Sequence, residues 1–261
     1  MQVPPALLVV VGVALLLRIA LSLVYSPTYA TSFDTNLYLD VAGGELFSDP
    51  TRPIGYPLFL RALHTLSDSV AFTIQVQHLL GIACGLLLYA TVRRLGAPAW
   101  AAVVATAAVL LPLDQIFLEH ILMAEAPFEL AIFAALYCAV RGLDPSRPTR
   151  LRIGSRTLWI AGAASLLALA AWLRATSLPL IPLFALWFAF ALYGPLARRL
   201  ARGVVCIAAA AAVLLAYMAL NASYTGNFAI SNASGWALYT RVAPFADCSR
   251  FAPPAGTEAL C

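Results

Sequence analysis

The sequence predicts an all-α membrane protein with about seven transmembrane helices and a long outer first loop that carries short interfacial helices. The 261-residue chain has a mean hydropathy of +0.86, only 11% of its residues are charged, and several long windows contain almost no charge. A soluble domain of this length needs more polar surface, whereas about 20 apolar residues in a helix span a bilayer. The short alternating strands of a membrane barrel are not visible in the sequence.

Seven apolar segments are the expected membrane spans. The first has no basic stretch before it and is long for a signal peptide, so we interpret it as an uncleaved helix. Residues 1–220 then form a transmembrane domain, and residues 221–261 form an outer segment. The expected spans are residues 4–25, 72–92, 99–117, 121–140, 157–173, 178–195 and 203–220.

The distribution of arginine predicts the orientation. All sixteen basic residues are arginine, and ten of them follow the second, fourth and sixth apolar segments. By the positive-inside rule these connections are cytoplasmic, so we expect a multi-pass protein of the plasma (inner) membrane with a cytoplasmic N-terminus. Most acidic residues then lie outside, which favours a site for chemistry on the outer face. The ten arginines are Arg93, Arg94, Arg141, Arg147, Arg150, Arg152, Arg156, Arg198, Arg199 and Arg202.

The outer loop, residues 26–71, contains the two segments with most functional interest. The stretch "SFDTNLYLDVAGGELF" predicts a short helix on the membrane surface, which the Gly43-Gly44 pair ends. The stretch "DPTRPIGYPLFLR" at 49–61 follows it. Its three prolines restrict the backbone and its glycine permits a tight bend, so we expect the arginine within it to be held rigidly.

Asp34 is the leading candidate for a catalytic base. It comes soon after the first span, where partial removal of water would raise the basicity of a carboxylate. Such a group can accept a proton from an acceptor hydroxyl or amine. The alternative interpretation is structural, with Asp34 capping a helix over residues 35–42.

Three arginines lie within or beside apolar segments. Arg52 and Arg174 each offer a planar set of donors suited to a phosphate, and the alternative for both is a side chain that extends to lipid head groups. Arg18 lies well inside the first span, so we expect it to pair with an acid or to face the interior of the helix bundle.

The outer ends of the third and fourth spans carry a polar group of residues. Glu125 begins a helix there, and Asp114, Glu119 and His120 precede it. This set could bind a divalent metal, but its spacing matches no established metal motif, so we predict no metal.

His64 and His78 are interpreted as isolated structural residues. In the outer segment at the C-terminus, Cys248 and Cys261 are expected to form a structural disulfide.

The order of these motifs resembles the GT-C superfamily of integral-membrane glycosyltransferases, which includes protein O-mannosyltransferases and lipid A aminoarabinose transferases. Those enzymes have a first span and then a long outer loop with an essential aspartate, followed by a basic-Pro-x-x-Tyr segment. The matching stretches are "FDTNLYLDVA" at 33–42 and "TRPIGYPLFL" at 51–60. The stretches "MAEAPFEL" at 123–130 and "WLRATSLPLIP" at 172–182 resemble later segments of bacterial members.

The resemblance implies a role for each matching residue. Asp34 is then the catalytic base, Arg52 contacts the donor phosphate together with the motif residue Tyr56, and Arg174 is a second phosphate ligand. Glu125 lines the substrate cavity. The implied donor is a sugar on a polyprenyl phosphate, and the acceptor is a glycan, lipid or protein, with membrane lipid as a further partner, no nucleic acid and no cofactor.

The sequence departs from the family pattern in two ways, and two other classes of function stay open as alternatives. Thr35 follows Asp34 where most relatives have an acid, and relatives have more spans, so we interpret the chain as the N-terminal portion of a longer enzyme. One alternative function is a transporter or flippase for an anionic lipid, which predicts broken spans and a repeat. The other is a non-catalytic membrane subunit.

Overall fold

The computed structural model describes residues 3–25, 33–143, 155–191, 194–231, 234–245, 247, 249–250 and 256. Within these residues the chain is helical and contains no strand. The predicted disulfide between Cys248 and Cys261 lies outside the described residues. In chain order the elements are α1 (Pro5–Val24), α2 (Phe33–Gly43), α3 (Gly55–His64), α4 (Val70–Arg94), α5 (Ala99–Leu110), α6 (Leu113–His120), α7 (Glu125–Leu143), α8 (Ser155–Leu173), η1 (Ala175–Ser177), α9 (Leu180–Phe190), α10 (Leu196–Thr225), α11 (Ser234–Val242) and η2 (Ala243–Phe245).

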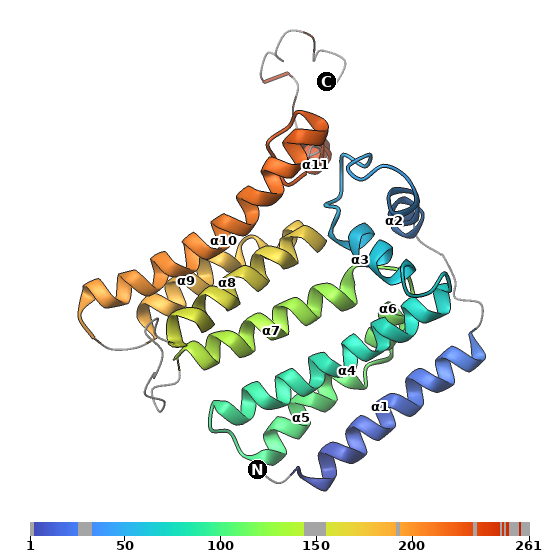
Figure 1. The fold of residues 1–261 in the computed structure, drawn as a ribbon, viewed down its shortest axis with the longest axis vertical. Coiled ribbons are helices and arrows are strands. Elements are labelled where there is room, and N and C mark those ends of the chain that lie inside the picture. Colours follow the sequence, from blue (N-terminus) through green and yellow to red (C-terminus); the bar gives the residue numbers. More distant parts are fainter. Residues whose placement is uncertain are drawn as a thin grey trace.

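The long helices lie side by side in a row from α1 to α10 (Figure 1). The most extensive packing joins α7 with α8, α8 with α10, α4 with α7 and α9 with α10. The short helices α2 and α3 pack on each other at one end of the long helices, beside the end of α8. The N-termini of α4 and α7 and the C-termini of α8 and α10 point to that end, which we call the outer-loop end.

Five described helices are long and apolar enough to cross a membrane, or six if α5 and α6 count as one bent span. The expected third span is broken by a 51° bend between α5 and α6. Pro112 lies in this break, where proline lacks an N–H and ends a helical ladder. The expected sixth span is the shorter apolar stretch Ala175–Phe190. The count of seven therefore stays a prediction.

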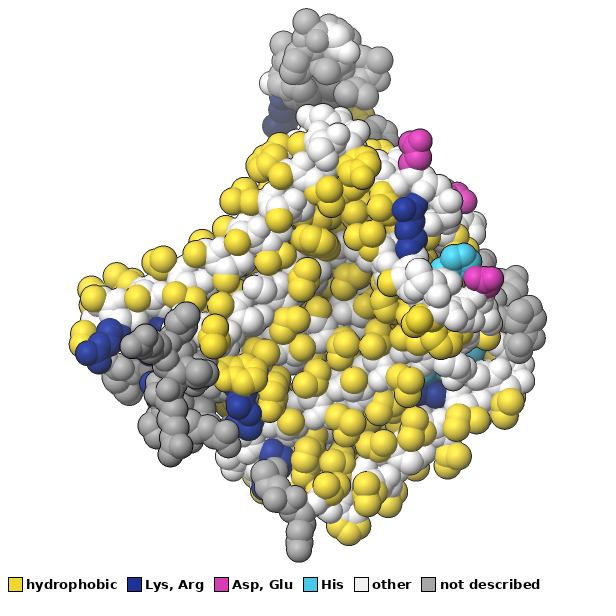
Figure 2. Space-filling view, in the orientation of Figure 1, with side chains coloured by type: hydrophobic (Ala, Val, Ile, Leu, Met, Phe, Trp, Pro, Cys, Tyr) yellow, Lys and Arg dark blue, Asp and Glu magenta, His cyan; other side chains and the backbone are white. Residues whose placement is uncertain are grey.

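The helices at the two edges of the row, α1 and α10, expose apolar side chains over most of their length. Such a surface is unfavourable in water and is typical of contact with lipid chains. Hydrophobic side chains cover the visible flank of the molecule (Figure 2). Exposed examples are Leu8, Val9, Leu16, Ile19 and Leu23 on α1, and Val204, Ile207 and Leu215 on α10.

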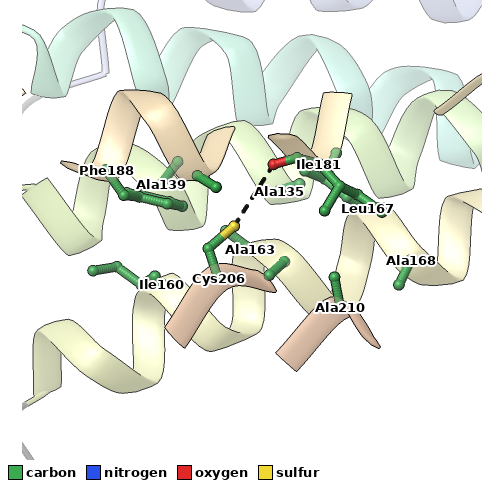
Figure 3. Close-up of a cluster of buried hydrophobic side chains, with 12 residues drawn as sticks. Ala135, Ala139, Ile160, Ala163, Leu167, Ala168, Ile181, Phe188, Cys206 and Ala210 are labelled. Carbon is green, nitrogen blue, oxygen red and sulfur yellow. Dashed lines mark hydrogen bonds between the residues drawn. The ribbon is translucent and has the colours of Figure 1, made fainter. Parts of the chain in front are cut away.

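The main core lies between α7, α8, α9 and α10 and consists largely of small residues (Figure 3). Small side chains let helix backbones approach closely in membranes, where packing rather than the hydrophobic effect holds helices together. Among the larger members, Phe188 is fully buried, and the Cys206 thiol lies 4.0 Å from the Ile181 carbonyl oxygen. The small members are Ala135, Ala139, Ala163, Ala164, Ala168, Ala185 and Ala210.

A buried ion pair joins α1 to α6. Arg18 and Glu119 are 2% and 0% exposed, and two bonds connect them, Nε to Oε2 at 2.7 Å and Nη2 to Oε1 at 2.6 Å. Arg18 Nη1 also donates to the carbonyl oxygens of Ala14 and Leu110. The expectation that Arg18 pairs with an acid is thus confirmed. Such fork geometry is the arrangement in which a buried charge is best tolerated.

Replacing Arg18 by methionine is expected to lower the free energy of unfolding by about 3–5 kcal/mol, because it leaves a buried carboxylate without its partner. The double variant Arg18→Met/Glu119→Met removes both charges and is expected to recover most of that loss. Thermal unfolding in detergent measures both values. Equal stability of the wild type and the Arg18→Met variant would contradict this account of the pair.

Candidate functional site

The helix α2 presents Asp34 at the outer-loop end. It spans Phe33–Gly43, and the Gly44 N–H closes its last turn on the Asp40 carbonyl oxygen. The helix and its end at the glycine pair are therefore as predicted, and its position on the membrane surface stays a prediction. Asp34 lies in the first turn, where a carboxylate suits the helix dipole, and its Oδ1 accepts a hydrogen bond from Arg52 Nη2.

Arg52 is held by its own loop. Its Nη1 donates to the Thr51 hydroxyl at 2.9 Å and lies 3.4 Å from Asp49 Oδ2. Asp49 in turn accepts the Thr51 N–H at 2.7 Å. The hydrogen bond and charge of Asp34 raise the pKa of Arg52, although partial burial acts in the opposite direction and is the largest single influence. Arg52 is thus oriented by contacts within its own loop, and its expected rigidity stays a prediction.

The glycine of the "RPIGYP" stretch allows the outer loop to touch α8. A Cβ on Gly55 would lie 2.4 Å from the Trp172 carbonyl oxygen and 2.5 Å from its carbonyl carbon. Both are backbone atoms, so they cannot move aside as a flexible side chain can. Next to it, the Ile54 N–H donates to the Tyr217 hydroxyl of α10 at 3.1 Å. Glycine is therefore required here for close approach.

A second ion pair forms where α8 ends. Arg174 follows Leu173 in an extended conformation, and its Nη1 donates to Glu125 Oε1 at the start of α7. The other oxygen, Glu125 Oε2, is buried and has no hydrogen-bond partner. This carboxylate can therefore accept one further donor. Residues 49 positions apart in the chain thus meet beside α2 and α3.

Tyr38 lies within electrostatic reach of both ion pairs. Burial raises the pKa of its hydroxyl, and the charge of Asp34 adds to that effect, while the charges of Arg174 and Arg52 oppose it. Tyr38 is only 5% exposed and belongs to an apolar cluster with Leu122 and Ala124, the residues just before Glu125. The charges of Asp34, Arg52 and Arg174 thus all act on Tyr38.

Tyr56 is buried beneath Tyr38 and does not line the surface of the candidate site. Its ring packs edge-on against Tyr38 with a centroid distance of 4.8 Å, and it is fully buried. Its hydroxyl donates to Gln77 Oε1 at 2.6 Å, and Gln77 Nε2 donates to the carbonyl oxygens of Glu119 and Ile121. Burial raises the pKa of Tyr56. A direct substrate contact, as the resemblance implied, does not match this burial.

The expected polar group at the third and fourth spans separates into two parts. Glu119 and His120 are buried in the bundle, whereas Glu125 faces Arg174 and Asp114 is exposed. The interpretation of His78 as isolated is wrong, because its ring nitrogens contact Glu119 and His120. Among the described residues, no group of three or more histidine, cysteine or acidic side chains has a geometry that could hold a metal ion.

Both ion pairs are partly exposed. The side chains of Asp34 and Arg52 are 31% and 23% exposed, and Arg174 is 36% exposed. Part of each guanidinium is therefore accessible to solvent. On the visible face, acidic side chains gather beside α2 and α3 (Figure 2). A cavity of about 610 Å³ lies along another flank of α2, lined by Leu39, Leu60 and other residues, and includes neither Asp34 nor Arg52.

Comparisons with protein-family models, with curated proteins and with solved structures found no match to this chain.

The Gly55→Ala substitution is expected to lower the free energy of unfolding by about 1–3 kcal/mol, because the added methyl group overpacks a backbone contact. Gly162→Ala on α8 is the matched control, since a Cβ there meets no atom within 4 Å. Unfolding of both variants in detergent measures the difference. A Gly55→Ala protein as stable as the Gly162→Ala protein would overturn the close-approach argument.

Proposed function

We propose that the protein is a glycosyltransferase that moves a sugar from a polyprenyl-phosphate donor to an acceptor at the outer face of the membrane. The single observation that carries this proposal is that two arginine–carboxylate pairs, Arg52–Asp34 and Arg174–Glu125, form at the end of the bundle that holds α2 and α3, and that charges from both pairs act on Tyr38. All four charged residues lie in the stretches that resemble the GT-C superfamily. The proposed orientation has a cytoplasmic N-terminus.

The donor phosphate binds by exchange of partners. Arg52 turns from Asp34 to the phosphate, and Arg174 turns from Glu125 to the same group. Guanidinium groups bind phosphate in the same forked geometry as carboxylate, so the exchange conserves the hydrogen bonds of each arginine. It also leaves the Asp34 carboxylate without its cation and therefore more basic. Binding of donor and activation of the base are then one event.

Asp34 acts as the general base in a single inverting displacement. It removes the proton from the acceptor hydroxyl or amine as that atom attacks the anomeric carbon. A bond forms between the acceptor and the sugar, and the bond between the sugar and the phosphate oxygen breaks. The polyprenyl phosphate leaves with the electron pair, and Arg52 and Arg174 stabilise the charge that it gains. No oxidant, reductant or further co-reactant is needed.

Asp34→Asn is expected to lower turnover by about 10²–10⁴-fold, the usual contribution of general-base catalysis. The side chain keeps its size, so the fold should be retained. Asp40→Asn, on an exposed part of the same helix, is the matched control and should keep full turnover. The measurement is transfer of labelled sugar from the polyprenyl-phosphate donor in membranes. Near-normal turnover in the Asp34→Asn protein would remove Asp34 from this role.

Arg52→Gln is expected to raise KM for the donor by about tenfold or more, since one charge-assisted contact is worth roughly 1.5–3 kcal/mol. Arg250→Gln removes a guanidinium that is 83% exposed and should leave KM unchanged. Donor titration with each variant gives the comparison. A similar change of KM in both variants would indicate a general effect of charge instead of a phosphate site.

A second candidate is a transporter for an anionic lipid. The bend of 51° between α5 and α6 favours it, because transporters build their sites at broken spans. The two functions differ in what happens to the sugar–phosphate bond. Vesicles that contain the protein and a labelled donor distinguish them: transfer of label to acceptor supports the enzyme, and movement of intact donor between leaflets supports the transporter.

A further inference from the structure

A cluster of ionisable side chains lies inside the bundle, apart from the candidate site. Arg18 comes from α1, His78 from α4, and Glu119 and His120 from α6. All four are at most 3% exposed. Ionisable groups inside membrane helices are costly and usually have a function. The proposed glycosyl transfer uses none of them.

The two imidazoles form a chain between two oxygen acceptors. His78 Nδ1 lies 3.0 Å from Glu119 Oε2, and His78 Nε2 lies 3.2 Å from His120 Nδ1. His120 Nε2 lies 3.0 Å from the carbonyl oxygen of Tyr25 at the end of α1. All four ring nitrogens are thus within hydrogen-bond distance of a partner, which fixes the orientation of both rings.

The chain contains three contacts, and each needs one proton. A carbonyl oxygen can only accept, and the Glu119 carboxylate already accepts from Arg18 at both oxygens. Two neutral imidazoles carry one N–H each, which supplies two protons for three contacts. In that state two lone pairs face each other in one contact. One additional proton satisfies all three contacts at once.

We propose that His78 and His120 together form a buried proton-binding site, which holds one proton beyond the two that neutral imidazoles carry. The proton is shared along the contact between the two rings. The site is independent of the proposed transferase activity, and it fits a transporter or a non-catalytic subunit equally well.

The residues around this cluster leave space for its side chains. A Cβ on Gly81 would lie 1.9 Å from Glu119 Oε1, so only glycine leaves space for the carboxylate. The Tyr25 ring packs edge-on against His120, with ring centroids 6.1 Å apart. Glu129 on α7, which accepts a hydrogen bond from Gln115, and the Cys84 thiol on α4 are within electrostatic reach of Glu119.

Hydrogen bonds next to this site also join several helices to one another. Arg18 Nη1 donates to the Leu110 carbonyl oxygen at 3.1 Å, at the end of α5 and just before the bend. Gln77, the neighbour of His78, connects the backbone of residues 119 and 121 with the Tyr56 hydroxyl under the candidate site. Loss of the proton therefore acts on the contacts between α1, α4 and α6.

The test is nuclear magnetic resonance of the full chain with 15N-labelled histidine in lipid nanodiscs, from about pH 5 to pH 8, the range in which free histidine changes charge. The chain has three histidines, and the exposed His64 serves as the internal reference. The expected result is a state in which His78 and His120 carry three N–H protons between them. Two N–H protons on the pair at every pH would overturn the proposal.

The variant His120→Phe provides a second measurement. It leaves one contact, between His78 and Glu119, for which a single neutral imidazole is sufficient. His78 should then carry one N–H and lose the additional proton. An imidazolium at His78 in this variant would show that Glu119 alone holds the proton, against a shared site. If the variant does not fold, the wild-type spectrum alone decides.

Discussion

The contact between Gly55 and the backbone of Trp172 is the constraint on which the candidate site depends. Without a side chain at this position, α3 can lie directly on the end of α8. Arg52 comes three residues before the contact and Arg174 two residues after it. The same approach places the Tyr56 ring against Tyr38, which belongs to α2. One close backbone contact thus brings both arginines to the outer-loop end, although they are far apart in the sequence.

The ion pairs described here differ in how far their side chains are exposed to solvent. Arg18 and Glu119 are buried, so removing one partner costs several kcal/mol and the pair is structural. The pair of Arg52 and Asp34 is partly exposed, and exposed pairs typically contribute about 0–1 kcal/mol. A phosphate can therefore displace the Asp34 carboxylate from Arg52 at little cost. This difference is the physical reason to assign ligand exchange to the outer pairs and a fixed arrangement to the inner one.

Hydropathy and the positions of proline and glycine predicted much of the fold, because both are local properties of the sequence. They correctly indicated α1, the short helix α2 and its end at Gly43. The bend at Pro112 and the short α9 were not predicted, since apolar content alone does not show where a span is interrupted. The partners of Arg18, Arg174 and His78 were also not predicted, because each pair joins residues more than 40 positions apart and depends on how the helices pack. Here a lone histidine in an apolar helix was a misleading signal.

The central claim is that Arg52 and Arg174 hold a lipid phosphate at the outer-loop end. The most direct measurement is 31P magnetic resonance of a short polyprenyl phosphate mixed with the protein in nanodiscs. The double variant Arg52→Gln/Arg174→Gln is compared with Arg93→Gln/Arg94→Gln, which removes two arginines at the opposite end of α4. The account predicts that the wild type and the second variant perturb the phosphate resonance and that the first variant does not. An equal perturbation by the first variant would contradict it.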